Sequence, residues 1–113
     1  MRIARRAALV PFTSEDGSLI RELVRSDAQS LAESTLGPGQ ATLRHYHRRA
    51  EEIYLIVEGS ARVEVDGETA EVGPGDAVLI PAGAWHALLP GEEGVRLLCT
   101  CVPAYRGDDT FFA

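Results

Sequence analysis

Short apolar segments separated by turn residues run along most of this chain. No window shows apolar residues recurring with the 3.6-residue period of an amphipathic helix. Instead, β-branched, aromatic and other apolar residues gather in short runs bounded by Gly, Pro and Asp. The pattern predicts strands near residues 18–24, 30–36, 40–47, 52–58, 61–66, 68–72, 77–80, 85–89 and 95–102. Many short strands at this spacing predict an all-β sandwich or barrel.

One turn between two of these strands has a specific signature. Asp66 and Gly67 separate the alternating segment 62–65 from the segment 69–72. Asp-Gly is a favoured pair for the two-residue type I′ turn, whose twist matches that of the flanking strands. The sequence therefore predicts a β-hairpin at this point.

The segment Ile53–Val57 is apolar at every position, whereas a strand with one solvated face alternates with polar residues. One of its faces can fill a barrel interior, so the other must be covered by something else. Two alternatives are open. The cover is either the N-terminal strand of the same chain or a second copy, which would make the protein a homodimer.

The chain has three histidines, His45, His47 and His86. His45 and His47 are two residues apart in a predicted strand, so their side chains leave the same face, which Leu43 shares. Two neighbouring imidazoles on one face can bind a single metal ion. The alternative for this pair alone is a solvent-facing His-X-His.

A carboxylate follows at the start of the next strand, in Glu52, and Tyr54 has the same parity. If Glu52 points inward, Tyr54 enters the same cavity. An inward, unpaired carboxylate in a small core is unfavourable, and a bound cation removes that penalty. His86 begins a further predicted strand, and it faces inward if Trp85 packs outside.

Composition narrows the classes of function. A length of 113 residues fits one domain, and a net charge of −6 favours neither a nucleic-acid backbone nor an anionic membrane surface as partner. All 11 basic residues are Arg, and the chain lacks both Lys and Asn, as expected of a GC-rich bacterial genome. The absence of Lys excludes Schiff-base chemistry and a lysine general base.

No segment has the length of a membrane span, and the N-terminal apolar run at 7–10 is too short for a signal peptide. Cys99 and Cys101 are too few for a disulfide framework, and their spacing in a strand disfavours a bridge. We therefore expect a soluble cytoplasmic protein with reduced thiols. These thiols are expected to be buried as small apolar groups, the alternative being a thiol beside the metal.

Two stretches resemble, in register, the two sequence motifs of the cupin family. Gly39–Gly59 fits G(X)5HXH(X)3,4E(X)6G, in which the six residues before the last glycine select Glu52 as the carboxylate. Gly75–His86 fits G(X)5PXG(X)2H. The family pattern then has Asn where this chain has Pro90, a departure that should affect the end of the strand more than the metal.

The resemblance implies a single-domain double-stranded β-helix, or jelly-roll barrel. N-terminal strands or an arm would occupy 1–28, the barrel 29–103 and a C-terminal tail 104–113. It also implies one divalent transition metal, Fe, Mn, Ni, Co, Cu or Zn, with one or two coordination positions left for water, oxygen or substrate. The implied ligands are His45, His47, Glu52 and His86.

Because the cupin scaffold hosts unrelated activities, function has to be inferred from the site. The ligand set favours a metal-dependent enzyme acting on a small organic molecule, and we expect an O₂-using, dioxygenase-like oxidoreductase. The alternatives are a redox-neutral isomerase, lyase or decarboxylase, and a non-catalytic protein that binds a metal and a small ligand.

Two side chains are candidates for acid/base catalysis, Tyr54 and Glu33. The alternatives are a packing aromatic for Tyr54 and a solvent-facing strand residue for Glu33. Arg48 and Arg49, between the ligands in sequence, would attract an anionic substrate or remain a solvated pair.

Overall fold

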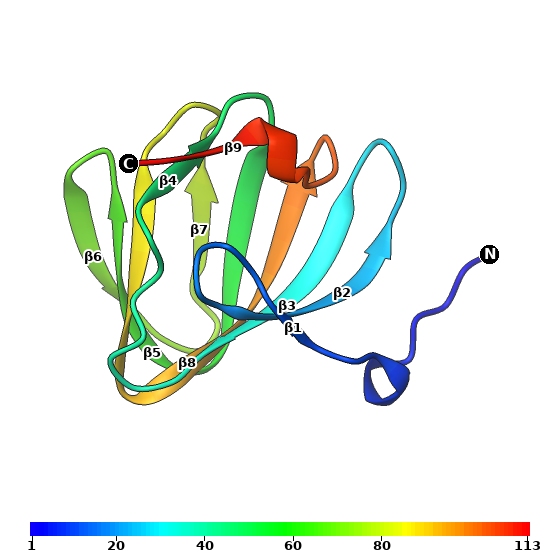
Figure 1. Cartoon of the computed structure of the whole chain (residues 1–113). Helices are drawn as coiled ribbons and strands as arrows, with labels where there is room; N and C mark the ends of the chain where they lie inside the picture. Colours follow the sequence, from blue (N-terminus) through cyan, green and yellow to red (C-terminus); the bar gives the residue numbers. More distant parts are fainter.

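The computed structural model describes all 113 residues, Met1–Ala113, and its strands form one curled sheet (Figure 1). Two short 3₁₀ turns, η1 (Arg6–Ala8) and η2 (Gly107–Asp109), complete the regular structure. No helix has the length and apolarity needed to cross a membrane. The strands are β1 (Phe12–Thr13), β2 (Leu19–Arg25), β3 (Ser30–Leu36), β4 (His45–His47), β5 (Glu51–Val65), β6 (Glu68–Val72), β7 (Ala77–Ile80), β8 (His86–Val102) and β9 (Thr110–Phe112).

Two long antiparallel strands, β5 and β8, form the frame of the barrel. They pair from Glu51 opposite Val102 to Val65 opposite His86. The sequence predicted four shorter strands here, at 52–58, 61–66, 85–89 and 95–102. In the structure the first two segments belong to β5 and the last two to β8. The register between β5 and β8 shifts around Gly59, and residues 91–94 of β8 have no partner on β5. The predicted breaks are therefore bends within continuous strands.

Glycine at position 59 is required by the bend itself. Gly59 has φ +76°, and a Cβ there would lie 2.0 Å from the carbonyl oxygen of Gly94. Gly94 has φ +80°, and a Cβ there would lie 2.6 Å from Leu36 O. Only residues without a side chain allow the two strands to approach this closely. This gives a physical reason for the final glycine of the first motif.

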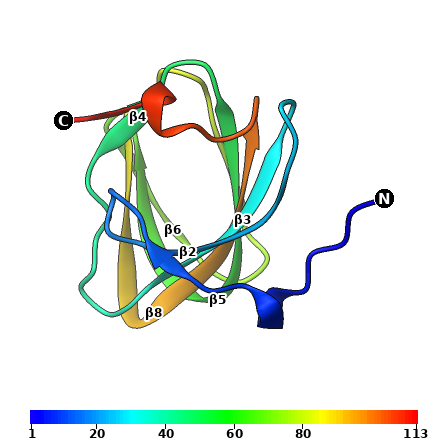
Figure 2. The same cartoon turned by 45° about the vertical axis from the view of Figure 1, so that its right-hand side comes forward.

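The remaining strands close the barrel on both sides of this frame. β3 pairs with β8, β2 with β3 and β1 with β2, while β6 and β7 pair with β5. β4 pairs with β8 at His45 opposite His86, and β9 pairs with β4. Figure 2 shows the strands surrounding an interior, with the C-terminal segment across one end. Because strands from 1–28, 29–103 and 104–113 share one sheet, these ranges describe the sequence rather than separate units.

Burial alternates along β5 as expected for a strand that lines a barrel. Glu52, Tyr54 and Ile56 are buried, whereas Ile53 and Leu55 are 41% and 40% exposed. The N-terminal strand pairs with β2 at the edge of the sheet and leaves this apolar face open. Cover by the chain's own N-terminal strand is therefore not what the structure shows. The interior is filled by Leu36, Tyr54, Ile56, Ala61, Val63, Ile80, Ala84, Leu88, Val95 and Leu97.

The predicted hairpin is confirmed, but the predicted strand at 40–47 is mostly wrong. Asp66 and Gly67 have φ of +47° and +88° between β5 and β6, as a type I′ turn requires. Only His45–His47 of the second segment is a strand. Before it, Leu43 N–H donates to Asp16 O in the loop after β1. Because the alternation does not extend this far, Leu43 is 58% exposed instead of facing the interior.

Candidate metal centre

Three imidazoles and one carboxylate meet inside the barrel. His45 and His47 come from β4, His86 begins β8 and Glu52 is the second residue of β5. All four are buried, with at most 6% of any of them exposed. One ligand atom from each histidine lies within 4.8 Å of the others. The inward orientation expected from strand parity is therefore found for all four.

The outer ring nitrogen of each histidine is fixed by a hydrogen bond. Nδ1 of His45 lies 2.7 Å from Leu43 O, and Nδ1 of His86 lies 3.0 Å from Ala84 O. Since a carbonyl oxygen can only accept, both Nδ1 atoms carry the proton. The Nε2 atoms of these two rings are then left with lone pairs.

His47 has the same tautomer, but its Nδ1 is bound by a side chain, that of Thr110. Its Nδ1 lies 3.0 Å from Thr110 Oγ1, and that hydroxyl donates its own proton to Arg106 O, also at 3.0 Å. Thr110 must therefore accept from His47, which fixes the same tautomer as in the other two rings.

Glu52 lies between two of the rings. Its Oε1 is 3.3 Å from Nε2 of both His47 and His86. Burial alone would raise the pKa of this carboxyl, but the two histidines lower it to about 2. Its other oxygen, Oε2, accepts from the Cys101 thiol at 3.6 Å. Glu52 is therefore an ionised carboxylate, with Oε1 facing two Nε2 atoms and Oε2 facing the Cys101 thiol.

Burial shifts the pKa values of His45 and His86, and the Glu52 carboxylate acts on that of His86. Burial lowers the pKa of His45, and the neighbouring His86 lowers it further. Burial acts in the same direction on His86, but Glu52 outweighs it, so the pKa of His86 is raised.

The donor set fits a divalent transition metal. Glu52 Oε1 and His86 Nε2 are buried without a hydrogen-bond partner. With the proton on Nδ1, two lone pairs face each other across 3.3 Å, and a cation between them removes that repulsion. Ligand atoms about 2.1 Å from one ion lie roughly 3–4 Å apart. The three imidazoles can therefore bind a metal ion, and Glu52 fits as a fourth ligand.

A cavity of about 370 Å³ adjoins this group. His45, His47 and Glu52 form part of its wall, and Tyr54 lies beside them. The Tyr54 ring packs edge-on against His86 with centroids 6.1 Å apart. Burial raises the pKa of this phenol, and Glu52 raises it further, so Tyr54 is neutral. The predicted placement of Tyr54 in the cavity is confirmed.

Glu33 is neither on the cavity wall nor exposed to solvent, so both interpretations of its position were wrong. Even-numbered residues of β3 face the cavity, whereas Glu33 faces the outside of the sheet. It is only 1% exposed, because Arg6, Arg21 and Arg96 surround its carboxylate at 2.7–3.1 Å. Sequence parity could not reveal that three arginines distant in sequence cover this position.

The C-terminal segment contributes to the site in ways that the sequence did not indicate. Besides Thr110, the Asp109 carboxylate accepts from the backbone N–H groups of Arg49 and Ala50, which fixes the loop between His47 and Glu52. The sequence predicted only a C-terminal tail at 104–113, whereas in the structure β9 pairs with β4 beside the histidines.

The side chains that alternate with the ligands point outward. Tyr46 stacks on Phe111 and packs edge-on against Trp85, so Trp85 lies outside, the condition under which His86 was expected to face inward. The Arg48 guanidinium lies 4.9 Å above the Phe111 ring. Neither Arg48 nor Arg49 lines the cavity. Both cysteines do line it and are free thiols, and Cys101 is buried, as expected, with its sulfur 3.6 Å from Glu52 Oε2.

The fold and this site define a cupin barrel with a histidine-rich centre. Residues 32–101 match the family model described as Cupin domain, so the chain belongs to the cupin family. A relative named "Uncharacterized protein MJ1618", from Methanocaldococcus jannaschii, is 39% identical over 106 residues, covering 88% of this chain and 85% of its own length. An L-ectoine synthase from Bordetella parapertussis is 32% identical over 92 residues, covering 79% and 70%.

Solved structures agree on the fold. The structure of KdgF from Halomonas sp. superposes with a TM-score of 0.86 at 21% identity, covering 96% of this chain and 97% of that one. Shorter sequence matches include two further enzymes. A dimethylsulfoniopropionate lyase from Ruegeria pomeroyi is 42% identical over 60 residues, covering 53% of this chain and 39% of its own. An oxalate decarboxylase from Bacillus subtilis is 36% identical over 84 residues, covering 70% and 22%.

Proposed function

We propose that this protein is a metal-dependent enzyme that cleaves a small organic molecule without net oxidation, as a lyase or decarboxylase. The observation that carries the proposal is the convergence of His45, His47, His86 and Glu52 inside the barrel, where His45, His47 and Glu52 also line the cavity. These four side chains are the proposed ligands of one divalent transition metal. When bound, such an ion stabilises negative charge that develops on a substrate oxygen.

The protein's own groups support such a reaction in three ways. The Nδ1 hydrogen bonds hold the three rings in one orientation, so the site needs little rearrangement when it is loaded. The barrel wall excludes bulk water from a developing charge. Tyr54 lies in the cavity next to His86, where its hydroxyl can donate a hydrogen bond or a proton to a leaving group.

The relatives favour redox-neutral chemistry over oxygen use. Two of the enzymes matched in sequence are named for elimination and decarboxylation, a lyase and a decarboxylase. The dioxygenase activity that the ligand set alone favoured remains a prediction and is the second candidate. Binding without catalysis is the third, and the presence of Tyr54 in the cavity favours catalysis.

The two enzyme classes differ in whether oxygen is needed. The metal-free protein is loaded separately with Fe(II), Mn(II) and Zn(II), and metal content is measured. Each form is incubated with a panel of small hydroxy, amino and carboxylic acids without oxygen and then in air, and products are identified by mass spectrometry. We expect products that have lost water, CO₂ or another neutral fragment to form without oxygen. Turnover that occurs only in air would support the dioxygenase instead.

The catalytic role of Tyr54 is tested by comparison with Tyr46, whose side chain lies outside the barrel. We expect Tyr54→Phe to lower kcat by about 10²-fold or more with unchanged metal content, since a positioned proton donor contributes that much. Tyr46→Phe, on the same sheet but facing away from the cavity, serves as the control. Full activity in Tyr54→Phe would remove the phenol from the mechanism.

A further inference from the structure

Charge is distributed unevenly between the cavity wall and the rest of the molecule. Four carboxylates line the cavity, from Glu15, Asp16, Glu22 and Glu52, and no arginine does. The chain has 11 arginines and no lysine, so all its guanidinium groups lie elsewhere. A substrate with a phosphate or a second carboxylate away from the metal would find no cationic side chain on this wall.

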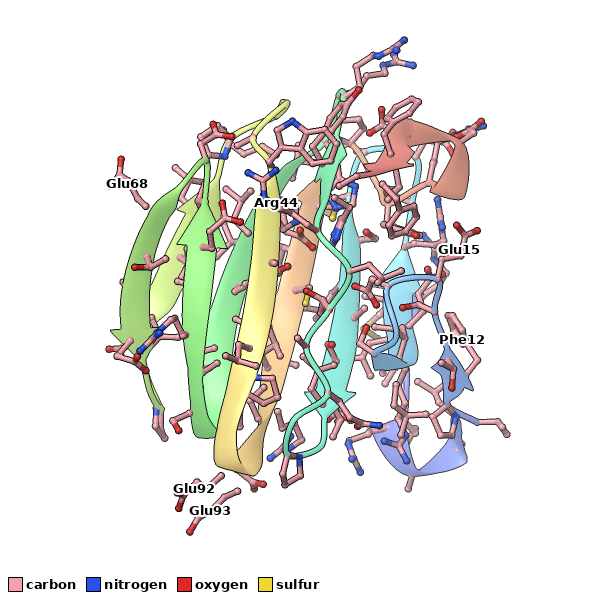
Figure 3. All side chains as sticks on the ribbon, turned by 60° about the vertical axis from the view of Figure 1, so that its left-hand side comes forward. Phe12, Glu15, Arg44, Glu68, Glu92 and Glu93 are labelled. Carbon is pink, nitrogen blue, oxygen red and sulfur yellow. The ribbon has the colours of Figure 1, made fainter.

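Several arginines are held outside the barrel by ion pairs. Arg96 binds both Glu33 and Glu58 on the outer surface, at 3.1 and 2.9 Å. Arg44 binds Glu64 at 2.7 Å and lies over the Trp85 ring, also outside (Figure 3). Arg44 and Arg96 would have to break these ion pairs to approach the cavity.

Asp16 offers a free oxygen to the cavity. Its loop is anchored by the Leu43 N–H, which donates to Asp16 O at 3.0 Å. Three donors, Ser14 Oγ, Ser18 N and Ser18 Oγ, bind the Asp16 carboxylate, and all three bind Oδ1. Oδ2 can therefore accept from a ligand. Cys99 lines the same cavity. Burial raises the pKa of its thiol most, and the charges of Glu52, Cys101 and Asp16 raise it further.

Further groups on the wall favour a cation. Glu22 on β2 also lines the cavity, and its carboxylate lies 3.4 Å from Arg25, which does not line it. Phe12, Tyr105 and Phe112 add aromatic rings to the wall. Figure 3 shows the N-terminal segment that carries Phe12 and Glu15 beside the C-terminal segment. Carboxylates combined with ring faces are a common way to bind ammonium groups.

The side of the cavity that holds the histidines contains an unpartnered polar atom. Glu52 is 6% exposed and lines the same cavity, yet its Oε1 has no hydrogen-bond partner within the protein. The cavity therefore has two chemically different parts. One is the group of metal-ligating side chains, and the other is an acidic, aromatic wall.

We propose that the substrate carries a positively charged amine or other onium group, which lies against Asp16, Glu22 and the aromatic rings. Its other end carries an oxygen-bearing group that faces the histidines and Glu52. This inference rests on the proposed function and adds the class of substrate to it. The substrate is then cationic or zwitterionic, rather than a sugar phosphate or a dicarboxylate.

Two small molecules of the same shape test the assignment. Choline and 3,3-dimethyl-1-butanol share a hydroxyl and a bulky end, and they differ in whether the central atom is a charged nitrogen or a neutral carbon. Binding of each to the Zn(II)-loaded protein is measured by calorimetry. We expect choline to bind about tenfold more tightly, because an ammonium gains that order of energy from a carboxylate and ring faces.

Matched variants locate the effect. Asp16→Asn keeps an Oδ1 that can accept the three internal hydrogen bonds, so the loop is retained while the charge is lost. We expect Asp16→Asn and Glu22→Gln each to reduce the preference for choline by about threefold or more. Glu68→Gln removes the same charge from an exposed hairpin far from this wall and should leave the preference unchanged (Figure 3).

The outcomes separate this inference from the proposed function. Equal or tighter binding of the neutral alcohol, absence of choline binding, or an equal effect of Glu68→Gln would overturn the substrate class. Zinc content is measured in the same samples. One bound zinc without a preference for choline leaves the proposed function standing, whereas failure to bind zinc contradicts the proposed function itself.

Discussion

At the scale of single residues, the orientation of the proposed metal ligands depends on neighbours outside both motifs. Thr110, at the start of β9, accepts from His47 Nδ1 and donates to Arg106 O. His45 and His86 instead use backbone carbonyls two residues before them in the chain. His47 is therefore the one histidine whose tautomer can be changed by a side-chain substitution.

We predict that Thr110→Val weakens metal binding by about tenfold, because loss of a hydrogen bond to a ligating histidine has effects of this size. Metal affinity is measured by competition with a chelator. Thr110→Ser keeps the hydroxyl and should restore most of the affinity, and Thr69→Val on the exposed β6 should have no effect. Equal affinities for the valine and wild-type proteins would exclude this role of Thr110.

The charge of Glu33 contributes to the stability of the fold rather than to the metal centre. Hydrogen bonding to Arg6 lowers the pKa of Glu33 most, Arg96 and Arg21 lower it further, and burial opposes them. A carboxyl whose folded pKa lies below its ordinary value of 4.5 stabilises the protein above that value. The stabilisation is lost as the pH falls through the lowered folded pKa.

We predict that Glu33→Gln lowers the free energy of unfolding by about 1–3 kcal/mol at pH 7, since three partly exposed arginines lose a buried partner. Urea unfolding at pH 7, 5 and 3 measures the gap from wild type. The gap should be similar at pH 7 and 5 and narrower at pH 3, while Glu68→Gln shows no comparable gap. A gap that widens on acidification would contradict the proposed sign.

At the scale of elements, the bend shared by β5 and β8 places both ends of the site on one barrel. β8 contributes His86 at its start and Cys101 near its end, and β5 contributes Glu52 opposite Cys101. If the two strands did not turn together at Gly59 and Gly94, the ends of β8 would lie too far apart to join one cavity.

Gly59→Ala should therefore reduce stability by at least about 2 kcal/mol, because a left-handed backbone strain of 1–3 kcal/mol adds to a backbone clash. Gly73→Ala is the matched control, since a Cβ at Gly73 meets nothing within 4 Å and no positive φ is required. Thermal unfolding of the two variants gives the comparison. Equal melting temperatures would mean that the strands can separate at the bend without loss of stability.

At the scale of the whole molecule, the outer face of β7, β5 and β8 carries exposed apolar side chains. Ile53 on β5 lies opposite Leu79 on β7, and Val102 on β8 lies opposite Glu51 of β5. The exposed fractions of Ile53, Leu79 and Val102 are 41%, 57% and 55%. Adjacent exposed apolar side chains of this kind mark association surfaces. The homodimer expected from the sequence remains a prediction that this face supports.

We expect the wild-type protein to be a dimer in light scattering after size-exclusion chromatography, and Leu79→Arg to raise the dimer dissociation constant by about a hundredfold. The reason is that burying an unpaired guanidinium in an apolar interface costs several kcal/mol. Leu89→Arg, at an exposed position of β8 opposite Arg62 of β5, is the control. A monomeric wild type, or two variants with the same behaviour, would reject this interface.

The sequence alone determined the features that depend on near neighbours in the chain. Alternation with period 2 fixed which residues of β5 face inward, and Asp66-Gly67 fixed the hairpin, because both follow from local backbone geometry. The spacing of the two motifs selected Glu52 and the three histidines. The facing of β5 and the hairpin need only the residues of one strand and its turn, whereas each motif that resembles the family pattern spans two strands and the loop between them.

The tertiary structure alone decided what lies beside what across the barrel. Thr110 binds His47, Cys101 binds Glu52, and three arginines cover Glu33, although 12 to 63 residues separate the partners. The acidic wall likewise combines the loop after β1, β2 and the C-terminal segment. Such contacts depend on strand register and barrel closure, which are set by the packing of the whole chain and which no local pattern encodes.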